Sequence, residues 1–238
     1  WGSFGPVHLA SLVVAALLVV GLYYLLKKRS VRTQTIVLGI LSFSGIAAII
    51  FNLVTWGSPL EYLPFHLCSL NALVLPVAVF TRNKTLGNLL LVWSLGALAA
   101  LAVNTAQAEY ELLSATFAFY FFPHVLEFGI PILLFKLGLV KKDAKCILST
   151  IAITMVVYTV VHFINKGINA WCAAAGIMSG EELLQVNYMY SITPEFPLLA
   201  LFHQVIPTEY WYMYMVVPIV AVYLLLVYAP QLLRRRAK

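Results

Sequence analysis

Long apolar stretches separated by short polar links dominate the 238-residue chain. Each stretch approaches the roughly 20 apolar residues that a helix needs to cross a hydrocarbon core of about 30 Å. The stretches lack the apolar and polar alternation of barrel strands and are about twice as long. We therefore predict an all-α integral membrane protein, one domain over residues 1–238, with seven transmembrane helices. The predicted spans cover residues 6–26, 33–55, 62–80, 86–103, 116–136, 146–164 and 210–232.

Charged residues in the links predict the direction of these spans. All of the 15 basic residues except Lys166 fall on one side of the predicted membrane, including the tail from Arg234 to Lys238. All of the nine acidic residues except Glu127 and Asp143 fall on the other side. Positively charged loops stay in the cytoplasm. The protein is therefore predicted to lie in the cell membrane with its N-terminus outside the cell and its C-terminus in the cytoplasm.

The link between the sixth and seventh spans, residues 165–209, is long for a helix connection. We predict that it forms an extracellular cap, helical near residues 179–186. Its apolar piece, residues 192–206, carries prolines that break a helix, which favours an interfacial or re-entrant stretch. A truncated eighth span is the alternative, although a full eighth crossing would spoil the charge pattern.

Composition supports a membrane protein and excludes several other classes. The chain is 62% hydrophobic and 10% charged, with a mean hydropathy of +0.93. Soluble domains hold about 45–50% apolar and about 25% charged residues. The formal charge of +6 lies in short runs between spans, so no nucleic-acid partner is predicted. Three cysteines without CxxC spacing predict neither a disulfide framework nor a structural zinc site.

Polar residues inside the predicted spans are concentrated toward the outer surface. Polar groups in hydrocarbon are costly and usually face a cavity or a partner. We therefore predict an outward-opening polar chamber near the outer leaflet, with headgroup contact as the alternative for individual histidines. The residues of this set are His8, Asn52, His66, Cys68, Asn71, His124, Glu127, His162, Asn165 and His203.

Cys68 is the strongest candidate nucleophile of this set. A thiol needs a base, and His66, two residues away, points to another face of a helix. His124 enters from the same side on another span and can meet Cys68 across a helix interface. Asn71 shares the Cys68 face at i+3, and Glu127 shares the His124 face at i+3, where it could orient the imidazole. The alternative is that Cys68 only packs as a small apolar side chain.

The residues around Cys68 also resemble the signature of a known family. The run LPFHLCSL at residues 63–70, followed by Pro76 and by TRN at 81–83, resembles the signature of the YwaF-like bacterial integral membrane proteins. The start at residues 4–8, Phe121-Phe122 with His124, and NYMY at 187–190 also match. The resemblance covers nearly the whole chain and is most specific from His66 to Cys68.

That family is similar to an animal multi-span acyltransferase that moves polyunsaturated acyl chains into ether phospholipids. It is more distantly similar to hydrolases of fatty acid esters of hydroxy fatty acids, which use threonine. The resemblance implies that Cys68 of a His-x-Cys motif forms an acyl-thioester and that His124 is its base. Asn71, Asn165 and Asn187 remain alternative donors to the oxyanion. The supporting or substrate-binding candidates are His66, Asn71, Glu127, His162, Asn165, Asn187, Tyr188 and His8.

The predicted partners are a phospholipid or fatty-acyl substrate and the membrane itself, with no cofactor, no metal and an open oligomeric state. A small-molecule or lipid binding or transport subunit with a polar pocket is the non-enzymatic alternative. A metal hydrolase of the seven-span ceramidase type is disfavoured because no two histidines are four residues apart. A retinal protein is disfavoured because the seventh predicted span has no lysine.

Overall fold

Helices make up most of the protein in the computed structural model, which describes residues 1–103 and 109–236, and residues 234–236 by their backbone alone. Lys238, part of the predicted charge pattern, lies outside the described residues. The chain divides into two compact units, residues 1–55 with 67–142 and residues 56–66 with 143–238. Each unit is described here by itself.

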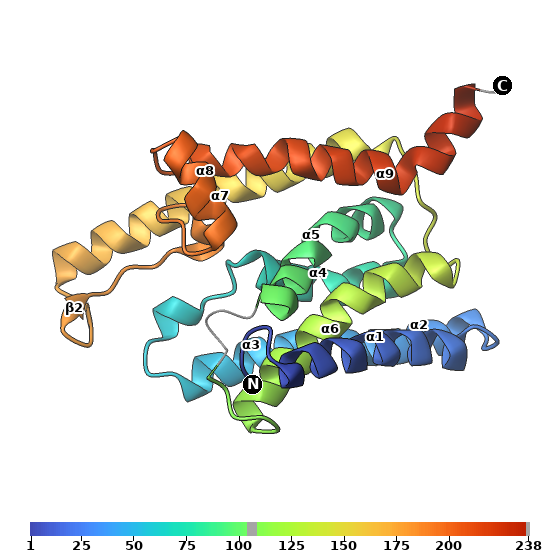
Figure 1. Cartoon of the computed structure of the whole chain (residues 1–238), viewed down its shortest axis with the longest axis horizontal. Helices are drawn as coiled ribbons and strands as arrows, with labels where there is room; N and C mark the ends of the chain where they lie inside the picture. Colours follow the sequence, from blue (N-terminus) through green and yellow to red (C-terminus); the bar gives the residue numbers. More distant parts are fainter. Residues whose placement is uncertain (104–108, 237–238) are drawn as a thin grey trace. The chain divides into compact units, whose positions relative to one another are not determined.

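The first unit is a helical bundle built around α6. Its helices are α1 (Pro6–Leu26), α2 (Val31–Ser42), α3 (Ser44–Thr55), α4 (Leu67–Thr81), α5 (Lys84–Val103) and α6 (Ala115–Lys136). Helix α6 contacts each of the other five (Figure 1). Leu38, Leu75, Leu90 and Ile130 are buried at the centre of this bundle. Helix α6 therefore brings residues of several neighbouring helices close to its own.

The second unit pairs two long helices with a set of short elements. Its elements are η1 (Pro59–Tyr62), α7 (Cys146–Ala175), β1 (Met178–Ser179), β2 (Glu182–Leu183), η2 (Tyr188–Tyr190), α8 (Pro197–Val205), η3 (Trp211–Met215) and α9 (Val216–Arg236). Helix α7 contacts α9 and η2, and η3 contacts α8 and α9. Residues 176–210, between α7 and η3, form the cap.

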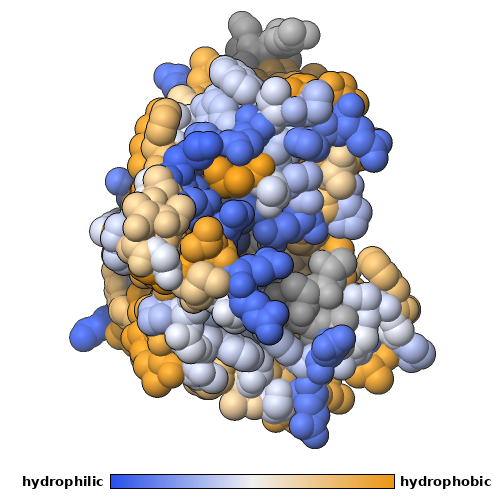
Figure 2. Space-filling model, turned by 90° about the vertical axis from the view of Figure 1, so that its left-hand side faces the viewer, coloured by the Kyte–Doolittle hydropathy of each residue, from blue (hydrophilic) through white to orange (hydrophobic). Residues whose placement is uncertain are grey.

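Six helices among the described residues are long and apolar enough to cross a membrane. They are α1, the rod of α2 and α3, α5, α6, α7 and the rod from Trp211 to Leu233. Helix α1 exposes Val13, Leu17 and Leu25, and exposed aliphatic rows of this kind suit contact with lipid. Hydrophilic residues gather over much of the face drawn in Figure 2. The predicted multi-pass architecture is thereby confirmed.

Helix α4 is the exception among the seven predicted spans. It has 15 residues, so it is about 22 Å long at 1.5 Å per residue, short of a hydrocarbon core of about 30 Å. Residues 59–62, predicted as the start of this span or just before it, form the turn η1 instead. The seventh crossing and the N-out, C-in orientation therefore stay predictions.

Helix α7 is longer than its predicted span, which was placed at residues 146–164. It continues to Ala175 and ends at Gly176, whose φ of 63° is left-handed and favours glycine. Hydropathy underestimates this helix because its last turns carry Asn165, Lys166 and Asn169, which lower the apolar score without breaking the helix. The predicted end of this helix at residue 164 was therefore wrong, and the first residues of the predicted cap are helical.

The cap also differs from its predicted secondary structure at residues 179–186. In place of a helix, β1 and β2 form a small antiparallel hairpin that pairs Met178 with Leu183 and Ser179 with Glu182. Gly180, with φ of 64°, makes the turn between them. Further along, Pro197 opens α8 at its first position, where the missing N–H of proline costs nothing.

Candidate functional site

Pro131 leaves one backbone carbonyl of α6 without its helical hydrogen-bond donor, and the side chain of Asn71 in α4 donates to it. Pro131 has no N–H, so the carbonyl of Glu127, four residues earlier, lacks its helical donor. The Asn71 side chain donates to this carbonyl from Nδ2 at 3.2 Å. Asn71 is fully buried, so the bond is shielded from water. It ties α4 to α6 at the level of the predicted site.

The Glu127 carboxyl lies where α3, α4 and α6 meet. A side chain added at Gly45 of α3 would strike both the Cβ of Ala72 in α4 and Oε1 of Glu127, so only glycine fits between the two helices. Oε2 of Glu127 and Oδ1 of Asn71 are buried without a hydrogen-bond partner in the described protein. Unpaired buried polar atoms are costly, so these two need a partner from outside the chain, such as water or a ligand.

The orientation of His124 is set within its own helix. Nδ1 lies 2.6 Å from the Tyr120 carbonyl, and a carbonyl can only accept, so Nδ1 carries the proton. In the neutral ring the lone pair then belongs to Nε2, which is the form of a general base. The Tyr120 ring packs on the imidazole at 4.5 Å, and its hydroxyl donates to the Ala100 carbonyl of α5. The carbonyl of Tyr120, and not Glu127, therefore holds the imidazole.

Cys68 is in the first turn of α4, and as a whole residue it is half-buried. The first backbone N–H groups of a helix have no acceptor inside it and stabilise negative charge nearby. The thiol and the imidazole thus belong to two helices of the same unit that contact each other.

The other two cysteines differ from Cys68 in their surroundings. Cys146 and Cys172 are buried in the second unit, and all three cysteines are free thiols. A fully buried thiol is an inert apolar group until its surroundings open. Among the three, Cys68 is therefore the least buried residue.

His66 belongs to the second unit, although it is only two residues before Cys68. Its Nδ1 accepts a long hydrogen bond of 3.4 Å from the Met189 backbone, so its proton is on Nε2. Its ring packs against Tyr188 and Tyr190 of η2. The structure therefore shows His66 as a contact of the cap.

Tyr188 and Asn165 fasten the cap to its surroundings. The buried Tyr188 hydroxyl donates to the Leu60 carbonyl of η1. Burial raises the pKa of Tyr188 to about 12, so the phenol keeps its proton at neutral pH. Asn165 of α7 donates from Nδ2 to the Tyr188 carbonyl and to Ser191 Oγ, and its Oδ1 accepts the Tyr188 N–H. Both amide atoms of Asn165 are thus occupied.

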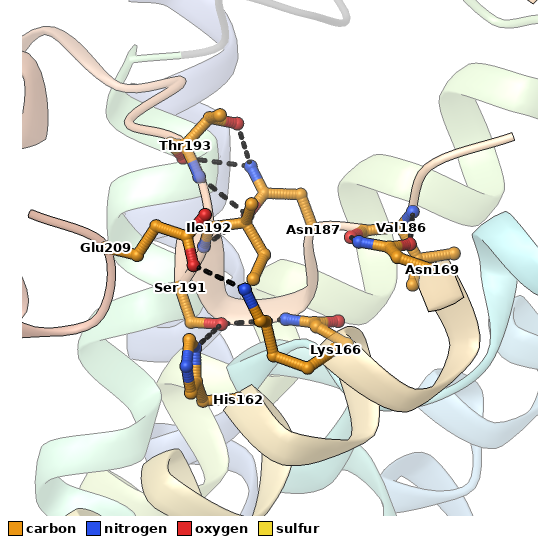
Figure 3. A network of polar contacts seen from close by, with 10 residues as sticks. His162, Lys166, Asn169, Val186, Asn187, Ser191, Ile192, Thr193 and Glu209 are labelled. Atoms are coloured by element: carbon orange, nitrogen blue, oxygen red, sulfur yellow. Dashed lines mark hydrogen bonds and ion pairs between the residues drawn. The ribbon is translucent and has the colours of Figure 1, made fainter. Parts of the chain in front are cut away.

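Three further side chains continue this network (Figure 3). His162 contacts Ser191 Oγ through Nδ1 at 3.1 Å. Asn169 makes two hydrogen bonds to the Val186 backbone. Asn187 donates from Nδ2 to Thr193 Oγ1, and its Oδ1 accepts the Thr193 N–H. Asn169 and Ser191 were not among the predicted site residues, and the available signal was the i, i+4 spacing of Asn165 and Asn169 on one helix face.

Lys166 and Glu209 form an ion pair at the edge of the same network, 2.9 Å long (Figure 3). Both side chains are about half exposed, at 54% and 47%. We expect a double-mutant cycle with Lys166→Gln and Glu209→Gln to give a coupling of about 0.2–1 kcal/mol, since water screens exposed pairs. Unfolding free energies of the four proteins measure it, and a coupling well above this range would show that the pair is buried in the membrane-bound protein.

His8 is occupied on both ring nitrogens within the first unit. Its Nδ1 accepts the Phe4 N–H at 2.9 Å, and its Nε2 donates to the Leu101 carbonyl of α5 at 2.7 Å. The ring is fully buried. This geometry ties the start of α1 to α5 and leaves no ring nitrogen for a ligand.

Of the ten predicted site residues, the first unit holds Cys68, Asn71, His124, Glu127 and His8, and the second holds His66, His162, Asn165, Asn187 and Tyr188. The structure brings Asn71 together with Glu127. Within residues 1–103 and 109–236, no group of three or more histidine, cysteine or acidic side chains is arranged to hold a metal ion.

Comparison with known proteins places this chain in a family. The sequence model of the TMEM164 family matches residues 3–229, which is nearly the whole chain. Searches of curated proteins and of solved structures found no match. The narrower resemblance to the YwaF-like bacterial proteins stays a prediction.

Proposed function

Because the chain belongs to the TMEM164 family of membrane proteins, we propose that it is a membrane-embedded lipid acyltransferase or acyl hydrolase in which Cys68 carries the acyl group. The observation that supports this most directly is the state of His124. Its Nδ1–H is held by the Tyr120 carbonyl, so Nε2 is the basic nitrogen. The half-buried residue Cys68 on the contacting helix α4 supplies the nucleophile.

In the first step Nε2 of His124 takes the proton of the Cys68 thiol. The thiolate attacks the ester carbonyl carbon of a phospholipid, so a C–S bond forms and the carbonyl oxygen becomes an oxyanion. When the oxyanion collapses, the ester C–O bond breaks and the imidazolium gives its proton to the leaving lysolipid alkoxide. The acyl chain is then held as a thioester on Cys68.

In the second step a lysolipid hydroxyl or water attacks the thioester. Nε2 of His124 takes the proton of this hydroxyl, and the Cys68 thiol is restored when the C–S bond breaks. A lysolipid as acceptor gives acyl transfer, and water gives hydrolysis. Both reactions use the same two side chains.

The oxyanion donors we propose are backbone N–H groups in the first turn of α4, where chain connectivity puts them beside the sulfur. Asn71 donates to the Glu127 carbonyl already. Asn165 and Asn187 are engaged within the second unit. The three asparagines that the sequence offered for this role therefore have other partners.

The test is to map the acyl group. Purified protein is incubated in nanodiscs with a polyunsaturated phospholipid, quenched with acid and digested, and the peptides are analysed by mass spectrometry. We expect an acyl mass on the Cys68 peptide that hydroxylamine removes, with the Cys146 and Cys172 peptides unmodified. A protein that retains and releases the lipid without this adduct would support the binding or transport alternative.

A further inference from the structure

The first unit has a second polar feature, far from Cys68. A hollow of about 370 Å³ opens where α2 begins and α4 ends, lined by Val31, Arg32, Thr35, Ile36, Phe80 and Arg82. Cys68 is in the first turn of α4 and Phe80 in the last, so about 18 Å of helix separates them at 1.5 Å per residue. The hollow is therefore separate from the proposed acyl site.

Two of the residues that line this hollow are arginines without a counter-charge among the described residues of their unit. Neither Arg32 nor Arg82 has a hydrogen-bond or ion-pair partner among the described residues. The described acids of this unit are Glu109 and Glu111, just before α6, and Glu127 within it. None is in the chain segments that form the hollow. Both arginines are exposed to solvent, so an anion from outside the protein can reach them.

The remaining lining fits a phosphate group attached to an apolar body. Thr35 Oγ1 is buried and has no hydrogen-bond partner in the described protein, so a hydroxyl is free to donate. Val31, Ile36 and Phe80 supply an apolar wall beside it. Guanidinium forks match phosphate oxygens bidentately, and the hollow lies at helix ends that the charge pattern predicts to be cytoplasmic, where a basic pocket suits an anionic lipid headgroup.

The backbone around the hollow is held in an unusual form. Arg82 has φ of 51°, in the left-handed region that residues other than glycine rarely adopt. Phe80 packs its ring directly against the backbone of Gly39, where a Cβ would collide with it. The wall of the hollow is therefore fixed by close packing between α2 and α4.

We propose that this hollow binds the phosphate group of an anionic lipid, with Arg32 and Arg82 pairing its oxygens and Thr35 donating from its hydroxyl. The ligand chemistry is a phosphate ester with an apolar neighbour. Inorganic phosphate shares the anion but not the apolar part. The two sources are therefore separated by direct competition.

The experiment measures binding of a short-chain fluorescent phosphatidic acid to the full chain in detergent. We expect Arg32→Gln with Arg82→Gln to weaken binding by about tenfold or more, as loss of two charge-assisted pairs predicts. Thr35→Val keeps the charge and should weaken binding by a smaller factor. The matched control, Lys27→Gln with Lys28→Gln, removes the same charge next to the hollow and should leave affinity nearly unchanged.

The outcomes separate the explanations. Equal losses in the arginine and lysine pairs would show attraction by net charge alone and overturn the proposal. Unchanged binding in the arginine pair, with a normal thermal unfolding midpoint, would also overturn it. Displacement of the probe by millimolar inorganic phosphate would assign the hollow to the free ion, whereas displacement only by unlabelled phosphatidic acid assigns it to lipid. The Cys68 thioester is mapped separately, so its absence leaves this test intact.

Discussion

Replacing His124 with asparagine is expected to slow acyl transfer by about 100-fold or more, because general base catalysis contributes roughly that much. The asparagine amide can take the place of Nδ1 and still donate to the Tyr120 carbonyl, so the helix keeps its local contact. What the variant lacks is a basic nitrogen at the position of Nε2. The measurement is the rate of acyl transfer between phospholipids in nanodiscs, with the unfolding midpoint of the same samples.

His162→Asn is the matched control for this experiment. His162 also uses Nδ1 for a local hydrogen bond, to Ser191, but it belongs to the second unit. We expect this variant to keep most of the rate. A normal rate in the His124→Asn protein, or an equal loss in both proteins, would contradict a base role for His124.

Asn71→Leu is expected to lower the free energy of unfolding by about 1–2 kcal/mol, because it leaves the buried Glu127 carbonyl without a donor. Pro131→Ala restores an N–H four residues after Glu127, so that carbonyl regains a helical partner. In the Pro131→Ala background, Asn71→Leu should therefore cost much less. Reversible unfolding in mixed micelles measures the four proteins of this double-mutant cycle.

Asn88→Leu provides the comparison for this cycle. Asn88 donates from Nδ2 to the carbonyls of Lys84 and Lys141, and neither bond involves Pro131. Its cost should be the same with and without Pro131→Ala, since independent sites add. If Asn71→Leu costs as much in the alanine background as in the proline background, the hydrogen bond is not filling the gap that proline leaves.

Much of the helical architecture could be predicted from hydropathy. The windows at residues 6–26, 86–103 and 116–136 agree with α1, α5 and α6 to within a few residues. The window at 33–55 became the rod of α2 and α3, broken at Phe43. These regions are uniformly apolar over a full crossing, so the limits of each apolar window coincide with the limits of the helix.

The prediction was poorer where apolar character and helical structure diverge. Residues 62–66 are apolar enough to extend a span, yet Pro64 and the contacts of His66 with η2 keep them outside α4. Asn165 and Asn169 lower hydropathy, yet they lie within α7 because their side chains bond to the cap backbone. In both places a contact with a distant part of the chain decided the structure.

The candidate site shows the same division. Spacing alone identified Cys68, His124, Asn71 and Glu127 as residues of two neighbouring helices. It assigned Glu127 to orient His124, whereas the Tyr120 carbonyl does so. It offered Asn71 as an oxyanion donor, although the amide caps a carbonyl that Pro131 leaves open. Periodicity gives the face of a residue but not the atom that it meets.

By itself, the sequence determined that this protein is a bundle of long apolar helices with polar groups in selected turns. The reason is that the cost of an exposed polar group in hydrocarbon adds up residue by residue along a segment. Only the tertiary structure decided which hydrogen-bond partner each buried polar atom has, such as the carbonyl that fixes the proton on His124. Such partners depend on how helices cross and how rotamers point, and no local sum contains that information.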